Sequence, residues 1–208
     1  MKSIDRKIIE VVRELHAISS AGILYTKEPF DKERYIRLRE IAAELLSEIS
    51  EDSYTKIIQV FEANSGYQTP KLSTRSVVFN DSDEILLVKD YDGKWVIPGG
   101  WCDYNKTIIE NTKKEAFEEA GLTVEPYRLV GLFDHHKRNN PGSFFDCIHA
   151  FMLCRVIDGV FHQNLETTQS GYFSMNCLPE LNDHKTSKEQ IDICFQAFKA
   201  EQWIPVID

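Results

Sequence analysis

The sequence predicts an α+β protein in which a helical hairpin precedes a mixed β-sheet packed between helices. Two observations predict this fold class. Apolar side chains recur at helical spacing through residues 4–49, and after residue 70 the pattern changes to short runs rich in β-branched and aromatic residues. The order that follows, strands, a helix, more strands and a final helix, is typical of α+β proteins rather than of repeated βαβ units.

Length, charge and cysteine content limit the classes of protein to consider. The 208 residues fit one domain of ordinary size with an appendage, and the net charge of −9 argues against nucleic acid as a partner. The five cysteines are odd in number and lack a C-x-x-C pair, which argues against a disulfide framework and a zinc knuckle and favours the reducing cytoplasm. No apolar run approaches the ~18 residues of a membrane span, and the N-terminus lacks the apolar core of a signal peptide.

Residues 1–66 are predicted to form an N-terminal helical domain. Two apolar stripes recur at helical spacing, and Asp31 is a plausible N-cap of the second helix. Acidic residues slightly outnumber basic ones in 1–52, so no DNA-reading arm is indicated. A hairpin of this size cannot bury its apolar face alone. We therefore expect it to pack on the rest of the chain or to form a homodimer with a second copy.

Residues 67–208 are predicted to form the catalytic domain, after a linker punctuated by Gly66 and Pro70. Its two ends give the clearest local signals. The sequence "NDSD" predicts a hairpin turn between strands at 75–79 and 84–90. Ser187 and Gln190 predict a capping box before the final helix. Between these ends we expect a helix over 106–120 and strands over 127–134, 147–156 and 171–175.

Three glutamates crowd the predicted helix over 106–120. At about 100° per residue, Glu115, Glu118 and Glu119 fall within about 100° of arc, where like charges repel. A hard divalent cation would remove that repulsion, since Mg²⁺ binds carboxylate oxygens together with substrate phosphates. An acidic stripe in solvent is the alternative. The preceding "PGG" turn, which can place a backbone carbonyl beside the helix start, favours a metal and phosphate site.

The residues from Gly100 to Leu122 resemble the Nudix box, whose pattern is G-x5-E-x7-R-E-U-x-E-E-x-G-U. The spacing is intact and seven of the nine defined positions agree. The stretches "TPK", "PGGWCD" and "ETTQSGYF" extend the resemblance to Nudix hydrolases with an N-terminal helical extension, which include ADP-ribose and CDP-choline pyrophosphatases. The resemblance implies a Nudix fold and a pyrophosphohydrolase that uses Mg²⁺, with Mn²⁺ as the alternative ion.

The resemblance also implies roles for particular residues. Glu115, Glu118, Glu119 and the carbonyl of Gly99 match the metal ligands. Either Glu119 or Glu166 would act as the catalytic base, and the sequence leaves this choice open. Arg75, Lys89 and Trp101 are candidates for substrate binding: the two cations for the phosphates, and the indole for a base. Each is also compatible with an ordinary surface or packing role.

Two positions depart from the Nudix pattern, because Lys106 and Lys114 stand where it has Glu and Arg. On a helical wheel, Glu110 lies four residues from each lysine, so we expect Glu110 to pair with both. This would place both lysines on a face separate from the metal ligands, and we expect the enzyme to be active.

The predicted function is therefore metal-dependent hydrolysis of a nucleoside diphosphate linked to another group, with CDP-choline and ADP-ribose as plausible substrates. Two alternatives stay open. One is RNA-end processing, by decapping or trimming. The other is a non-catalytic nucleotide sensor, although the retained Glu118 and Glu119 argue against it. The sequence does not identify the base or the linked group.

Overall fold

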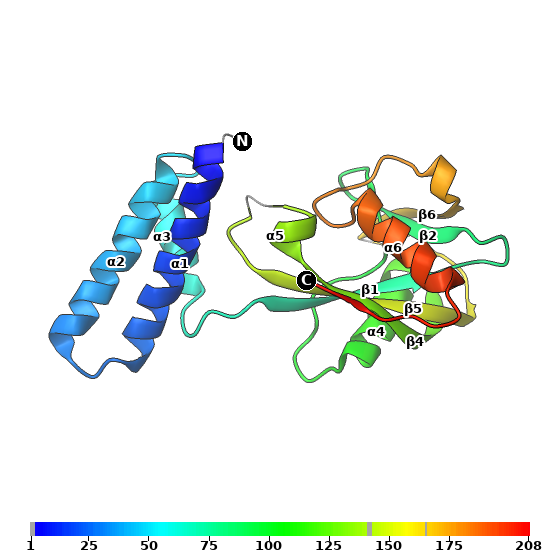
Figure 1. The fold of residues 1–208 in the computed structure, drawn as a ribbon, viewed down its shortest axis with the longest axis horizontal. Coiled ribbons are helices and arrows are strands. Elements are labelled where there is room, and N and C mark those ends of the chain that lie inside the picture. Colours follow the sequence, from blue (N-terminus) through cyan, green and yellow to red (C-terminus); the bar gives the residue numbers. More distant parts are fainter. Residues whose placement is uncertain (1–2, 141–142, 165) are drawn as a thin grey trace. The chain divides into compact units, whose positions relative to one another are not determined.

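The computed structural model describes residues 3–140, 143–164 and 166–208 (Figure 1). The chain forms two compact units. One comprises Met1–Pro70 with Gly142–Phe144, and the other comprises Lys71–Pro141 with Phe145–Asp208. Within the described ranges, no helix is both long and apolar enough to cross a membrane.

The first unit is helical, in blue and cyan in Figure 1. Its helices are α1 (Ser3–Tyr25), α2 (Pro29–Ser47) and α3 (Tyr54–Ala63). The helices share a small core made of Val12, Ala42, Ala43, Ile57 and Phe61.

Two features of this unit differ from the sequence-based expectations. The prediction of Asp31 as an N-cap was wrong: α2 begins at Pro29, which suits a first helical position, and Asp31 pairs instead with Arg34 at 2.7 Å. The helix α3 was not predicted. Its N-cap is Ser53, whose hydroxyl accepts a hydrogen bond from the Lys56 N–H. Its residue Phe61 stacks on Phe144, with ring centroids 4.6 Å apart.

The second unit contains two sheets. The mixed sheet has the strand order β1-β5-β4-β7, in which β1 pairs parallel with β5 and β4 pairs antiparallel with β5. The smaller antiparallel sheet has the order β3-β2-β6. The strands are β1 (Lys71–Val78), β2 (Ile85–Asp90), β3 (Trp95–Val96), β4 (Leu122–Asp134), β5 (Cys147–Gly159), β6 (Thr167–Phe173) and β7 (Val206–Ile207).

Helices cover both faces of the mixed sheet (Figure 1). α4 (Ile108–Ala120) packs on one face through a core that includes Val78, Ala116 and Met152. α6 (Lys188–Lys199) packs on the other through a core that includes Phe151 and Ile191. The short elements α5 (His135–Arg138) and η1 (Met175–Cys177) complete the unit.

The α+β architecture with a mixed sheet between helices confirms the predicted fold class. The capping box at Ser187 and Gln190 is present at the start of α6, as predicted. The turn at "NDSD" is also present, with Asp83 at a φ of 58°. The strands β4 and β5 are longer than predicted, because bulges let them continue past Pro126.

Candidate active site

The helix that carries the three glutamates has well-defined ends. The Thr107 hydroxyl accepts a hydrogen bond from the Glu110 N–H, and the Glu110 carboxylate accepts one from the Thr107 N–H in return. Gly121 ends the helix in the left-handed conformation, with a φ of 68°. These caps fix the helix between residues 108 and 120, so that Glu115, Glu118 and Glu119 lie on its last two turns.

The "PGG" turn runs along the edge of β1. The Thr74 N–H donates to the Gly100 carbonyl at 2.9 Å, and the Ser76 N–H donates to the Pro98 carbonyl at 2.7 Å. A Cβ at Gly99, whose φ is +152°, would lie 2.0 Å from the Thr74 oxygen. At Gly100 it would lie 2.6 Å from Glu115 Oε2. Gly99 is therefore required by the backbone, whereas a side chain at Gly100 would displace the carboxylate of Glu115.

Asn111, which sequence reasoning missed, ties this turn to the helix and the sheet. Its side-chain amide donates to Thr74 Oγ1 at 2.8 Å and to the Trp101 carbonyl at 3.2 Å. Its oxygen accepts a hydrogen bond from the Asp103 N–H at 3.0 Å. Asn111 is completely buried. A polar residue at a core position of an amphipathic helix was the available signal.

Lys114 lies among the glutamates. Its Nζ is 3.0 Å from Glu118 Oε2, 3.2 Å from Glu115 Oε1 and 3.1 Å from Asp103 Oδ2. Partial burial lowers the pKa of Lys114, but the bonds to Glu118, Asp103 and Glu115 outweigh this effect and hold the pKa above its usual range.

The prediction that Glu110 pairs with both lysines was therefore wrong. Glu110 is used in the capping box with Thr107, and Lys106 acts on it only through its charge, which helps to lower the Glu110 pKa. Lys114 has a better partner in Glu118, which also lies four residues away and on the side of the carboxylate cluster. The lysine thus stands with the glutamates rather than on a separate face.

Glu119 is held by the turn. The Gly99 N–H donates to Glu119 Oε2 at 2.7 Å. Burial raises the pKa of Glu119 to about 7, although the Gly99 hydrogen bond and the charge of Arg75 oppose the shift. Burial also raises the pKa of Glu115, against the opposing effect of Lys114. Two carboxylates of the cluster are therefore poorly solvated, and their negative charge is only partly compensated.

Arg75 is buried, with 5% of its surface exposed, and its guanidinium donates to the Gly99 carbonyl. This is the carbonyl that the resemblance suggested as a metal ligand. Burial lowers the pKa of Arg75, while the charges of Glu119 and Glu115 oppose that shift. Arg75 thus lies behind the turn, where it compensates part of the carboxylate charge.

The loop that carries Glu166 packs on the end of α4. The Asn164 amide donates to the Glu118 carbonyl at 2.8 Å, and the Thr167 hydroxyl donates to the Glu119 carbonyl at 2.7 Å. Glu166 itself is exposed, and its charge helps to raise the pKa of Glu119. The structure thus brings the two candidate bases close together.

The other two predicted substrate residues lie on separate elements. Trp101 has 57% of its surface exposed, and Lys71 Nζ lies 5.8 Å from the centre of its ring. Lys89 is half-buried on β2, next to Asp90, which pairs with Lys185. Sequence reasoning missed this ion pair, because its members are far apart in the chain.

Among the described residues, no group of three or more His, Cys, Asp or Glu side chains is arranged as a set of metal ligands. The carboxylates of α4 have other partners here. Lys114 holds Glu115 and Glu118, and the Gly99 N–H holds Glu119.

Comparison with known families assigns most of the chain. Residues 69–193 match the model of the NUDIX domain, and residues 6–61 match the UDP-X-like N-terminal oligomerisation domain. The chain belongs to the Nudix family. This confirms the resemblance stated from the Nudix box, and it places the glutamate-bearing helix and the "PGG" turn inside the Nudix domain.

Three relatives of this Nudix protein cover much or all of it. A putative ADP-ribose pyrophosphatase of Bacillus subtilis is 31% identical over 94% of each chain. The crystal structure of an ADP-ribose pyrophosphatase from Streptococcus suis is 44% identical over 67% of this chain and 100% of that one, with a TM-score of 0.63. The crystal structure of a UDP-X diphosphatase is 28% identical over 100% of both chains, with a TM-score of 0.64.

The Nudix domain and these relatives support a pyrophosphohydrolase, which confirms the prediction of an enzyme. Nudix hydrolases generally use divalent metal ions. The carboxylate cluster of α4 is therefore the candidate active site of this Nudix hydrolase.

Proposed function

We propose that this Nudix hydrolase cleaves the pyrophosphate bond of a nucleoside diphosphate linked to a second group, releasing a nucleoside monophosphate and the phosphorylated group. The observation that carries the proposal is the cluster on α4, where Glu119 is buried against the Gly99 N–H with Glu166 close by. The similarity to proteins named ADP-ribose pyrophosphatase and UDP-X diphosphatase supports the same bond type.

The cluster has the donor chemistry for Mg²⁺ or Mn²⁺. Glu115, Glu118 and Glu119 offer carboxylate oxygens, which these hard cations prefer, and burial leaves two of them with raised pKa values. The Lys114 ammonium forms ion pairs with both Glu115 and Glu118, where a metal ion would also bind. When bound, a divalent ion would neutralise phosphate charge and lower the pKa of a water molecule. The Gly99 carbonyl would join this set through one of its two lone pairs, while the other accepts the hydrogen bond from Arg75.

The chain's own residues would complete the chemistry. Glu119 or Glu166 would accept the proton of the attacking water. Arg75 would hold the Gly99 carbonyl and so keep the turn in place against Glu119. Trp101, which is largely exposed, would offer a ring face to the base, and Lys89 would meet the phosphates from β2.

ADP-ribose, CDP-choline and UDP-linked groups are the substrates to compare. The relatives' names favour ADP-ribose and UDP-linked substrates, whereas CDP-choline rests on the resemblance alone. The net charge of −9 continues to argue against RNA ends. The five free cysteines support a cytoplasmic location.

We also propose that the protein forms a homodimer through its N-terminal helices. The match to an N-terminal oligomerisation domain supports this proposal. On α1, four apolar residues lie seven positions apart and so on one side of the helix. They are exposed within the chain: Ile4 by 65%, Val11 by 42%, Ile18 by 48% and Tyr25 by 67%. Such a stripe is typical of a surface that a second copy covers.

The test of the proposed activity is a substrate panel. The protein is incubated with ADP-ribose, CDP-choline, UDP-glucose and capped RNA, each with Mg²⁺ or Mn²⁺, and the products are identified by mass. We expect a nucleoside monophosphate and a phosphorylated partner from at least one nucleoside diphosphate derivative. Hydrolysis of none of these, or of capped RNA only, would overturn the proposal.

A further inference from the structure

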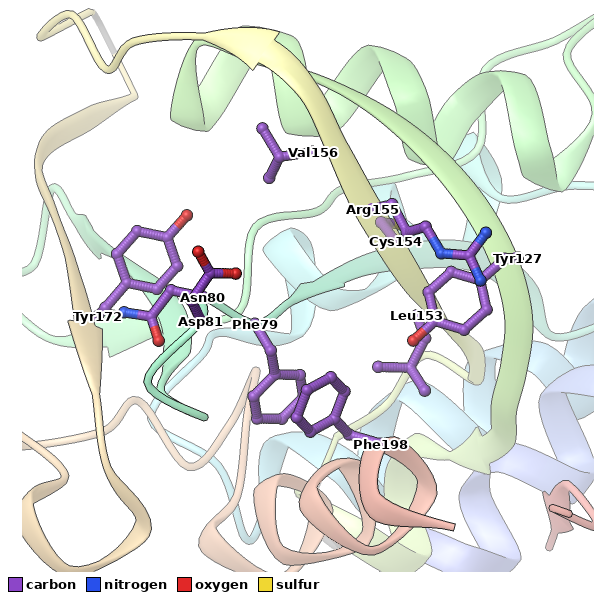
Figure 2. A pocket seen from close by; sticks show the side chains of 10 residues that line it. All are labelled: Phe79, Asn80, Asp81, Tyr127, Leu153, Cys154, Arg155, Val156, Tyr172 and Phe198. Atoms are coloured by element: carbon purple, nitrogen blue, oxygen red, sulfur yellow. The ribbon is translucent and has the colours of Figure 1, made fainter. Parts of the chain in front are cut away.

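A cavity of about 420 Å³ lies in the second unit, beyond the end of β1 (Figure 2). This volume is within the range of small-molecule sites. Figure 2 shows Tyr172 on one side of the cavity and Tyr127 with Arg155 on the other. The lining residues are Phe79, Asn80, Asp81, Tyr127, Leu153, Cys154, Arg155, Val156, Tyr172 and Phe198.

This cavity is distinct from the carboxylate cluster. The "PGG" turn pairs with residues 74–76 of β1, whereas the cavity begins at Phe79, about 13 Å further along an extended chain than Arg75. On β6, Tyr172 pairs with Leu86, several residues from Thr167, which contacts the end of α4. The two sites therefore lie toward opposite ends of the sheets.

The cavity forms because β5 continues beyond the end of its neighbour β1. The pairing of β1 with β5 ends at Val78 and Cys154, while β5 continues to Gly159 along β4 only. The chain turns away at Asn80, whose side chain is used within the turn, where its amide donates to Glu84 at 2.8 Å. Among the residues that the structure describes, one edge of β5 from Arg155 onward therefore has no strand partner.

Aromatic rings form much of the lining. Phe79 and Phe198 stack with ring centroids 4.1 Å apart and an interplanar angle of 10°, and they form the floor seen in Figure 2. Tyr127 and Tyr172 stand at the sides, with 38% and 37% of their surfaces exposed. A partly exposed aromatic side chain such as Tyr172 favours a planar ligand that can stack on it.

The charged groups of the cavity are Arg155 and Asp81. The Arg155 guanidinium lies 4.5 Å from the centre of the Tyr127 ring, and among the described residues it forms no ion pair with a carboxylate. Glu125, its cross-strand neighbour, pairs with Lys113 instead. Cys154 stays a neutral thiol, because burial raises its pKa to about 12. The free guanidinium is thus available for an anion such as a phosphate.

We propose that this cavity binds a nucleoside monophosphate at a site separate from the carboxylate cluster. The base would stack on the ring of Tyr172 with its N–H groups toward Asp81, and the phosphate would pair with Arg155 on the opposite side of the cavity. This proposal goes beyond the proposed function, because it requires neither catalysis nor a metal.

The test is a titration of the full-length protein in EDTA, in which binding is measured from the amide chemical shifts by NMR. The probes are adenosine, cytidine and uridine monophosphates, with inorganic phosphate and adenosine as the two halves of a ligand. We expect at least one mononucleotide to shift the amides of Val156 and Tyr172, and to bind about tenfold more tightly than either half.

Variants then test the role of the guanidinium. Arg155→Ala should weaken mononucleotide binding about tenfold, Arg155→Lys should weaken it less, and Arg34→Ala, a cation on α2, should leave it unchanged. Three results would overturn the proposal: no mononucleotide binding at millimolar concentrations, equal affinity in the Arg155→Ala protein, or phosphate binding as tightly as the mononucleotide. Because Glu119 has no part in this site, Glu119→Gln should bind like the wild type even if the proposed hydrolysis fails.

Discussion

Lys114 Nζ lies 3.0 Å from Glu118 Oε2, inside the cluster of carboxylates that defines the candidate active site. A positive charge at this position compensates the repulsion between glutamates when no metal is bound. It must also compete with a metal for the same oxygens. The departure of this chain from the Nudix pattern at Lys114 therefore affects the metal site directly.

Replacing Lys114 with alanine should strengthen metal binding. Loss of one positive charge at this distance should tighten Mn²⁺ binding about fivefold, because the remaining carboxylates carry more uncompensated charge. The measurement is a Mn²⁺ titration without substrate, in which electron paramagnetic resonance reports the free and bound Mn²⁺. Lys113→Ala is the matched control, since the neighbouring Lys113 pairs with Glu125 on β4. Equal Mn²⁺ binding in Lys114→Ala would show that the lysine does not compete with the metal, and weaker binding would show that it supports the metal site.

Glu166→Gln should separate the two candidate bases. If Glu119 accepts the proton, the variant should lose less than about tenfold in kcat, because Glu166 is exposed and acts on Glu119 mainly through its charge. If Glu166 is the base, kcat should fall by about 100-fold or more. Steady-state kinetics with saturating Mg²⁺ distinguish these results. Glu201→Gln, at an exposed position after α6, serves as a control for a simple loss of surface charge.

The exposed stripe on α1 predicts how the dimer can be dissociated. Val11→Asp with Ile18→Asp should yield a monomer, because two buried carboxylates would have no partners in the interface. Light scattering at micromolar concentration measures the mass. Glu14→Asp on the same helix should stay dimeric. A wild-type monomer, or a double variant that remains a dimer, would contradict assembly through this surface.

His16 makes the helical unit sensitive to acid. Its ring is buried against Phe61, 4.4 Å between centroids, and burial together with the charge of Arg39 lowers its pKa to about 4. A histidine with a pKa below that of the unfolded chain, about 6.5, contributes stability above pH 6.5 that is lost as the pH falls toward 4. The loss can reach about 3 kcal/mol.

Hydrogen exchange of the α3 amides between pH 7 and pH 5 measures this effect, after correction for the intrinsic rates. His16→Phe should remove most of the pH dependence of protection, since a phenyl ring cannot be protonated. If protection falls equally in both proteins, other groups control the acid sensitivity and the assignment to His16 is wrong.

The sequence was sufficient for the fold class and for the position of the candidate site, because each rested on a local signal. The capping box at Ser187, the turn at "NDSD" and the spacing from Gly100 to Leu122 involve residues close in the chain. The same local rules also misled. Lys114 lies four residues from both Glu110 and Glu118, and helical spacing alone did not show that the Thr107 cap occupies Glu110.

The contacts that were missed join distant segments. Arg75 reaches Gly99 from β1, and Asn111 reaches Thr74 from α4. Neither partner could be found before the strands were placed side by side. The same holds for the cavity beside Tyr127, which depends on β5 continuing past the end of β1. Such features follow from strand register, which a single sequence does not specify.

The central claim, that the carboxylates of α4 carry out pyrophosphate hydrolysis, is tested most directly by Glu119→Gln. The measurement is kcat on the best substrate of the panel, with saturating Mg²⁺ and with the fold checked by circular dichroism. We predict a loss of about 100-fold or more, while Glu125→Gln, on the strand that follows the helix, stays near the wild-type rate. Wild-type activity in the Glu119→Gln protein would contradict the account.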